Sequence, residues 1–367
     1  MRRLTGMGPA GGVLTLGVVL ILVAGTFDAE ALYVPGVAFV LLSAVAVAWV
    51  ALAARGVRVS RSLEGRRVAE DEPLGIVLEV SGSAIPLPGG ALHDPLLGEP
   101  VALGFGRAQR RVRVRARFAR RGRRQLAPSE VVVRDPLGLA TVVVAAGHAD
   151  EVLVLPRVEA VRSLRGGDAG GARRRGRPAM AAEVELDGVR EHRPGTPASR
   201  IYWPALARGA GLMERRLRAE SDSRPMVVLD ARGAEREEDL DAAVRAAASL
   251  AVSLARDGGS QVLLPGDRRP TALDETLSGW PHLHARLALV EGGGRASLSG
   301  LASRLGPVIY VAPHVPSRAP RALEHAPAAG RIVVCPGAMP GRRPSFTVAG
   351  CTGYTLEPAR ARTGAVA

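Results

Sequence analysis

The pattern of hydrophobic and polar positions divides the chain into an apolar start, a region of short alternating runs, and a region in which apolar runs alternate with helical patterns. The start contains two uncharged apolar stretches, from Gly11 to Phe27 and from Ala31 to Ala54. About 20 apolar residues are enough for a helix to cross the hydrocarbon core of a bilayer. Residues 1–55 are therefore predicted to form a hairpin of two transmembrane helices, rather than a signal peptide or a buried pair of helices.

The charges around these stretches predict the orientation of the hairpin. Arg2 and Arg3 precede the first stretch, Arg55 follows the second, and Asp28 and Glu30 lie between them. Because cytoplasmic flanks of membrane helices are enriched in basic residues, both ends of the hairpin are predicted to be cytoplasmic. The protein is thus expected in the cell membrane, with its soluble domains in the cytosol.

Short alternating runs follow the hairpin and are separated by turn sequences rich in Gly, Pro and Ser. Such runs are typical of strands, and no helical period of useful length interrupts them. Residues 56–156 are therefore predicted to form a small β-sandwich. The runs on which this prediction depends are residues 57–61, 75–80, 131–133 and 152–155.

One predicted strand of this sandwich is unusually basic. Arg111, Arg113, Arg115 and Arg117 alternate with apolar or small residues, so one face of the strand presents guanidinium groups. Three interpretations remain open. The face is a solvated edge that discourages pairing with other sheets, it attracts anionic lipids near the anchor, or it contacts an acidic partner or a nucleic-acid backbone.

The remainder of the chain is predicted to contain an α/β domain over residues 223–356. A helix follows the first apolar strand, with acidic residues in its first turns and Arg256 at its end. Apolar strands that alternate with helical stretches indicate a parallel sheet covered on both faces. Residues 157–182, rich in Gly and Arg, are predicted to be a flexible linker, and residues 357–367 a disordered tail. The predicted strands are residues 226–230, 261–264, 307–311 and 331–335.

Residues 183–222, between the linker and the α/β domain, contain a dense charged motif: VREHRPG at 189–195, RIYW at 200–203, AR at 207–208 and then a charged strand. This order resembles the domain-of-unknown-function 58 family, in which such a motif precedes a von Willebrand factor A-like domain. A DPLGL turn at 135–139 resembles the same family. His192 and Thr196 depart from the family pattern, which usually has Tyr and Asp there. The matching positions are Arg190, Gly195, Arg200, Ile201, Trp203, Ala207 and Arg208.

The resemblance implies a membrane-anchored fold of the α/β plus β class: a two-helix hairpin, a β-sandwich and a von Willebrand factor A-like (Rossmann-type) α/β domain. It also implies a scaffold or protein-interaction role with a MoxR-type AAA+ ATPase as partner, in assembly or chaperone-like work. Interaction is expected at the motif, including Arg190, His192 and Arg208. Trp203, at the start of a short helix among charged neighbours, is expected to be buried.

In von Willebrand factor A-like domains, the loop after the first strand usually reads D-x-S-x-S and holds a divalent metal. The corresponding loop here, from Asp230 to Ala234, lacks both hydroxyls and has Arg232 in place of the first. A guanidinium competes with a metal ion for the carboxylate, so the site is expected to be degenerate, without a metal or another cofactor. Arg232 is expected either to pair with Asp230 or to receive an acidic group directly.

Other functional classes receive less support from the sequence. The net charge is +14, but all 49 basic residues are Arg, as a GC-rich genome produces. Because aromatic residues make up only 3%, a stacking platform for nucleic acid is not expected. His282 and His284 lack an obvious third metal ligand and are predicted to be a loop pair, and Cys335 is predicted to be a core residue.

Three alternatives therefore stay beside the scaffold interpretation. The first is a hydrolase-type enzyme that uses His192, Asp187 and Asp230. The second is a metal-dependent adhesion module, and the third is lipid or nucleic-acid binding through arginines. Since no Gly-rich phosphate loop is present, the sequence predicts no enzymatic activity.

Overall fold

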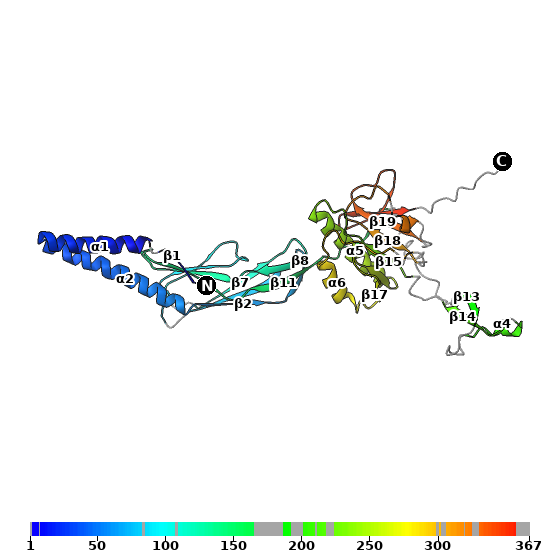
Figure 1. Cartoon of the computed structure of the whole chain (residues 1–367), viewed down its shortest axis with the longest axis horizontal. Helices are drawn as coiled ribbons and strands as arrows, with labels where there is room; N and C mark the ends of the chain where they lie inside the picture. The colour runs from blue at the N-terminus through cyan, green and yellow to red at the C-terminus, as the bar shows by residue number, and fades with distance from the viewer. Residues whose placement is uncertain are drawn as a thin grey trace. The chain divides into compact units, whose positions relative to one another are not determined.

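The chain divides into two compact units, Met1–Val154 and Leu155–Ala367, and each is described by itself (Figure 1). The computed structural model describes residues 2–6, 8–82, 85–106, 109–164, 186–191, 201–209, 211–217, 224–298, 301, 306–318, 320–324 and 330–356.

The first unit begins with a hairpin of two antiparallel helices, α1 (Gly8–Phe27) and α2 (Tyr33–Arg55), joined by a short 3-10 turn at Glu30–Leu32. Both helices are long and apolar enough to cross a membrane, as judged by length and composition. They approach closely at Gly17 and Gly36, where a Cβ atom on Gly17 would lie 2.8 Å from the carbonyl oxygen of Gly36. Small residues allow such close packing between membrane helices. The prediction of two apolar helices is confirmed.

The last turns of α2 pack against the strands that follow the helix. Val50, Ala53 and Ala54 are buried and belong to the core of the strands that follow. Trp49, one turn earlier, donates a hydrogen bond of 2.9 Å from Nε1 to the carbonyl oxygen of Pro86. The end of the second apolar stretch is therefore part of a folded core.

Three sheets of mainly antiparallel strands surround this core and form the β domain, which consists of residues 56–154 together with one strand that precedes the hairpin. Their strand orders are β1-β10-β9-β5-β6, β3-β11-β8 and β2-β4-β7. Alternating residues of each strand enter the core, as in β4, where Ile76, Leu78 and Val80 are buried. The strands are β2 (Arg58–Leu63), β3 (Arg67–Ala69), β4 (Leu74–Ser81), β5 (Gly90–His93), β6 (Val101–Leu103), β7 (Gln109–Ala116), β8 (Gly122–Leu126), β9 (Ser129–Arg134), β10 (Thr141–Ala146) and β11 (Asp150–Leu155).

The residues before the hairpin also belong to the β domain. β1 (Arg2–Gly6) pairs antiparallel with β10, so that Arg2 lies opposite Val144. The sequence indicated only a basic flank here. Because β1 precedes α1 and β2 follows α2, both ends of the hairpin are attached to one domain.

The second unit is built on an eight-stranded sheet with the order β12-β20-β21-β19-β18-β15-β16-β17. The four central strands, β19, β18, β15 and β16, are parallel, and antiparallel strands extend both edges. These elements are β12 (Arg162–Ser163), β15 (Met226–Leu229), β16 (Ser260–Leu263), β17 (Thr271–Leu273), β18 (Val308–Val311), β19 (Arg331–Pro336), β20 (Pro344–Val348), β21 (Cys351–Leu356), α5 (Glu237–Arg256), α6 (Trp280–Ala288) and α7 (Arg321–Glu324).

Alternation along the parallel strands fills two cores, one on each face of the sheet. Val227 and Leu229 face the core that includes α5 and α6, while Met226 and Val228 face the core that includes Leu323 of α7. The predicted parallel sheet with both faces covered is confirmed. As predicted, α5 has Glu237, Glu238 and Asp239 in its first turn and Arg256 in its last.

Two further segments belong to the second unit. Residues 157–164, expected to begin a linker, instead lie along the α/β domain: β12 pairs with β20, and the amide of Glu159 donates to the Ser249 hydroxyl at 2.9 Å. The motif region contains β13 (Leu186–Glu191) paired antiparallel with β14 (Met213–Leu217), and α4 (Trp203–Ala207) between them.

Candidate functional site

Asp230 directly follows β15, at the carboxyl end of a central parallel strand. The order β16-β15-β18-β19 places the first strand of the series between its second and third, so connections leave β15 and β18 in opposite directions. In open α/β sheets, ligands bind at the crevice where this reversal occurs. The loops after β15 and β18 are therefore the part of the fold best placed to form a site.

Both carboxylate oxygens of Asp230 are occupied by groups of the protein itself. Arg232 donates from Nε to Oδ1 at 3.1 Å and from Nη2 to Oδ2 at 2.7 Å, and its backbone amide also donates to Oδ1. The hydroxyl of Tyr310 donates a short hydrogen bond to Oδ2. The Asp230 side chain is only 3% exposed, whereas that of Arg232 is 45% exposed.

These contacts fix the charges of the cluster. Burial by itself raises the pKa of Asp230, but hydrogen bonds from Arg232 and Tyr310 outweigh that effect and hold the pKa below its usual value. The hydrogen bond to Asp230 raises the pKa of Arg232, and burial together with Asp230 raises the pKa of Tyr310. The cluster is therefore a closed ion pair at neutral pH, with a neutral tyrosine beneath it and a cation on the outside.

The loop that presents Arg232 is held on several sides. The backbone of Ala231 exchanges hydrogen bonds with Gly293 and Gly294, at 2.8 and 3.1 Å. Gly233 has a positive φ of 69°, and a Cβ atom there would lie 2.9 Å from Nδ1 of His314. Nδ1 of His314 lies 3.1 Å from the carbonyl oxygen of Arg232. The guanidinium is thus displayed from a well-fixed turn.

The residues present do not fit a divalent metal at this loop. Mg²⁺ requires several oxygen ligands in octahedral geometry, and Asp230 has no oxygen left without a donor from the protein. Within the described residues, no group of three or more His, Cys, Asp and Glu side chains could hold a metal ion. The expectation that Arg232 pairs with Asp230 is confirmed.

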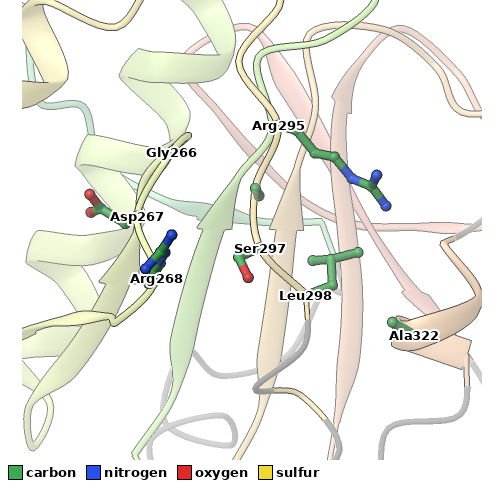
Figure 2. Close-up of a pocket in the computed structure, with 8 residues that line it drawn as sticks. Gly266, Asp267, Arg268, Arg295, Ser297, Leu298 and Ala322 are labelled. Carbon is green, nitrogen blue, oxygen red and sulfur yellow. The ribbon is translucent and has the colours of Figure 1, made fainter.

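A shallow pocket of about 580 Å³ lies between the loop that follows β16 and the segment that follows Gly294, whose carbonyl oxygen accepts from the amide of Ala231 (Figure 2). Arg268 and Arg295 line it and extend in different directions from its two sides. Asp267 is paired with Arg286 at 2.5 Å. The polar groups do not converge on a common point, so the pocket adds exposed positive charge to the edge rather than an assembled catalytic site.

The motif residues are only partly described. His192, Gly195 and Arg200 lie outside the described residues, and Arg190 is described only as a backbone position in β13. Trp203 begins α4 and is 57% exposed, so the expectation that it is buried is wrong. Arg208, also exposed, follows this short helix. Among the described residues, none covers Trp203, and this exposure could not be read from the local sequence.

The basic strand is β7, and it lies at the edge of the sheet β2-β4-β7. The side chains of Arg111, Arg113 and Arg115 are exposed, while Val112 and Val114 pack against the core. Arg111 pairs with Glu79 at 3.1 Å, and Arg117, just beyond the strand, donates to the carbonyl oxygen of Asp71 at 3.1 Å. The predicted basic face and apolar face are confirmed, and the edge position agrees with the interpretation that the arginines discourage further pairing.

The residues considered for catalysis do not form a described constellation. Asp187 lies on β13, in a separate two-stranded sheet, and only its backbone is described. His282 and His284 lie on α6 rather than in a loop, and His284 stacks on Trp280 with its Nε2 2.6 Å from the carbonyl oxygen of Pro156. Cys335 is fully buried, as predicted, and burial raises its pKa to about 11.

Two polar contacts were missed by sequence reasoning. Tyr310 is the only hydroxyl in the run VIYV, which was the available signal, but its contact with Asp230 depends on the register of β15 and β18. In the β domain, the side chain of Arg61 is 3% exposed and pairs with Asp94 at 2.6 Å and Asp150 at 3.2 Å. These two ion pairs join β2 to two distant segments. Nothing in the sequence distinguished Arg61 from the arginines that lie on the surface.

A scan of the sequence against models of protein families finds no match, and a search of the curated proteins finds none either.

Proposed function

We propose that this chain is a membrane-anchored interaction protein whose α/β domain binds an acidic group of a protein partner through Arg232. The observation that carries the proposal is the Asp230–Arg232–Tyr310 cluster: the carboxylate is closed, while the guanidinium it holds remains about half exposed. A fixed cation is thereby presented at the carboxyl ends of the parallel strands, where α/β folds bind ligands.

The fold assignment within this proposal is a degenerate von Willebrand factor A-like domain. It is supported by the parallel strands β16-β15-β18-β19 and by the acid that ends β15. In this interpretation, Arg232 takes the place of the metal: it is bound by the same carboxylate and offers positive charge to a partner's acid. Bidentate pairing with carboxylates is the geometry for which guanidinium groups are well suited.

The membrane anchor is the hairpin of α1 and α2, with both of its ends on the cytoplasmic side. The basic residues before α1 and after α2 favour this orientation. The pairing of β1 with β10 supports the same-side arrangement, because one domain contains both ends of the hairpin. The resemblance to the domain-of-unknown-function 58 family suggests a MoxR-type AAA+ ATPase as the partner.

The proposal can be tested by cross-linking in native membranes, with a photoreactive residue in place of Ala234 in the full chain. We expect an adduct with a protein partner in which an Asp or Glu lies within the cross-linked peptide. In an otherwise identical chain, Arg232→Gln should reduce the adduct roughly tenfold or more, since truncating one partner of a close interfacial charge pair costs about 2 kcal/mol or more.

A matched control is Arg236→Gln, because Arg236 is a neighbouring arginine that also pairs with an acid, Asp239 at 3.0 Å, and is 70% exposed. This variant should leave the adduct unchanged. If both variants lose the adduct equally, or neither does, the partner does not use the charge of Arg232 and the proposal fails. Thermal unfolding of each variant checks that the fold is retained.

A further inference from the structure

The junction between the hairpin and the β domain is a compact structural unit rather than a flexible joint. Val50, Ala53 and Ala54 of α2 enter the β-domain core, and the amide of Ala10 in α1 donates to the carbonyl oxygen of Leu139 at 3.2 Å. Both helices are therefore fixed to the β domain at one level of the molecule. The side chains exposed at this level adjoin the apolar surface of the hairpin.

One of these side chains is displayed by a well-ordered turn. Leu137 is 64% exposed at the tip of the turn between β9 and β10. The buried Asp135 organises this turn by accepting hydrogen bonds from the amides of Leu137 at 2.9 Å and Ala140 at 2.6 Å. The same turn continues into Leu139, which bonds to the first residues of α1. A large apolar side chain is thus held outward beside the start of a helix.

A second exposed side chain lies beside the other helix. Phe105, after β6, is 72% exposed, and its ring meets that of Trp49 edge to face with the centroids 5.8 Å apart. Trp49 lies on α2, where the helix begins to enter the β-domain core. Trp and Tyr gather where membrane helices leave the hydrocarbon, and Phe105 packs against such a tryptophan from the side of the β domain.

Exposed apolar side chains are present along both helices of the hairpin. Leu14, Leu16, Leu41 and Val45 are each between 41% and 59% exposed. From the start of α1 to its end at Phe27, the helix rises about 30 Å, the thickness of the hydrocarbon core. If the far end of the hairpin reaches the opposite leaflet, the level of Trp49 coincides with the near membrane interface.

We infer that Phe105 and Leu137 insert into the interfacial layer of the bilayer and hold the end of the β domain against the membrane. The occupant of this surface is lipid, since Phe105 contacts Trp49 of α2 and the turn of Leu137 is bonded to the start of α1. The guanidinium of Arg134 lies over the Leu137 turn, where it is placed to meet anionic headgroups. This inference rests on the proposed insertion of the hairpin in a membrane.

The experiment measures depth in the bilayer. Single cysteines replace Phe105 or Leu137 in the full chain, carry a nitrobenzoxadiazole fluorophore, and are reconstituted in vesicles of phosphatidylcholine and phosphatidylglycerol. Quenching is compared between lipids with a nitroxide near the headgroup and lipids with one deep in the acyl chains. The native cysteines, Cys335 and Cys351, are fully buried and should give no labelling in the unmodified chain.

Two control positions calibrate the measurement. Val18→Cys on α1 reports the hydrocarbon core, and Arg123→Cys on β8, at the end of the β domain opposite the hairpin, reports water (Figure 1). We expect labels at 105 and 137 to be quenched severalfold more by the shallow nitroxide than by the deep one. The label at position 18 should be quenched more by the deep nitroxide than by the shallow one. The label at position 123 should be quenched by neither.

Each other outcome overturns the inference in a recognisable way. If labels at 105 and 137 behave like the label at Arg123 while Val18 is deep, the hairpin is inserted but the β domain stands away from the membrane. Blue-shifted emission without quenching by either lipid would show that protein, such as a second copy of the chain, covers the surface. If Val18 is not quenched by the deep nitroxide, the membrane anchor itself fails, and the inference fails with it.

Discussion

Millimolar Mg²⁺ or Mn²⁺ is expected to leave the thermal unfolding of the full chain unchanged. The carboxylate of Asp230 already accepts hydrogen bonds from Arg232 and Tyr310 on both oxygens. A metal ion at this loop would therefore have to displace groups of the protein before it gained a ligand. The loop provides no hydroxyl between Asp230 and Ala234 to compensate.

The cost of metal binding follows from the geometry. Nη2 of Arg232 lies 2.7 Å from Oδ2 of Asp230, so an ion bound to this oxygen would lie about 4 Å from the guanidinium. At that separation a divalent ion and a unit positive charge repel by about 8 kcal/mol at an effective dielectric of about 20. Because the Arg232 side chain is 45% exposed, screening by water reduces the repulsion to roughly half that value.

Movement of Arg232 away from the ion does not remove the cost. The guanidinium would give up its hydrogen bonds to Asp230 from Nε and Nη2, each worth about 1.5–3 kcal/mol because the acceptor is charged. By either route the penalty is several kcal/mol. A single carboxylate is not expected to offset it for an ion that dehydrates as reluctantly as Mg²⁺.

The assay is thermal unfolding in detergent micelles with and without the metal. A ligand present at one hundred times its Kd would stabilise the fold by about 2.7 kcal/mol, which is readily measured. The variant Arg232→Ser with Ala234→Ser restores both hydroxyls and removes the cation, and Tyr310→Phe added to it frees Oδ2. These variants should gain a metal-dependent rise in midpoint that Asp230→Asn abolishes. A rise in the unmodified chain that Asp230→Asn abolishes would refute the reasoning and favour a metal-dependent adhesion module.

Three further outcomes are expected. Trp203→Ala should change stability by no more than about 0.5 kcal/mol, as is usual for surface positions, and a large drop in the unfolding midpoint would mean that Trp203 is covered. Asp94→Ala should destabilise the β domain by about 3–5 kcal/mol, because the buried guanidinium of Arg61 loses its closest counter-charge. Hydrogen exchange of the core strands measures this loss. Asp150→Ala should destabilise the domain less, because the Asp150 side chain is 27% exposed. A reporter that is active only outside the cytoplasm should stay silent when fused after Ala367, and activity would overturn the proposed orientation.

The elements with strong local patterns were predictable from the sequence. The strands β15, β16, β18 and β19 are short apolar runs, and α5 has its acids at the start and an arginine at the end, so each pattern specifies its element without reference to the rest of the chain. The same holds for the two apolar helices and for the alternation of arginine and valine in β7. Local sequence was sufficient wherever burial on one face repeats with a regular period.

The features that depend on distant partners were not predictable. β1 consists of the polar run RRLTG and is a strand because it pairs with β10. β12 has only two residues and is defined by its pairing with β20. Tyr310 reaches Asp230 through the alignment of two strands that are far apart in the sequence. In each case the decisive contact is set by register, which no local period contains.

For the candidate site, the sequence predicted the charges but not their arrangement. An arginine two residues after the acid that ends β15 was sufficient to predict a possible ion pair. The sequence did not show how exposed each side chain of the pair would be. It also did not show that Tyr310 would donate a hydrogen bond to Asp230. The error at Trp203 has the same origin, since exposure depends on neighbours that the local sequence does not name.

The pairing of β1 with β10 has a consequence for the order of events during synthesis. β1 precedes the hairpin in the chain, so it finds its partner β10 only after both helices and most of the β domain have been made. Until then β1 stays unpaired, and the open side of β10 remains a template for other strands. Domains generally fold as units, in order from the N-terminus, so this late closure would couple completion of the sheet to prior placement of the hairpin. Completion of the β domain would then depend on correct packing of the two helices.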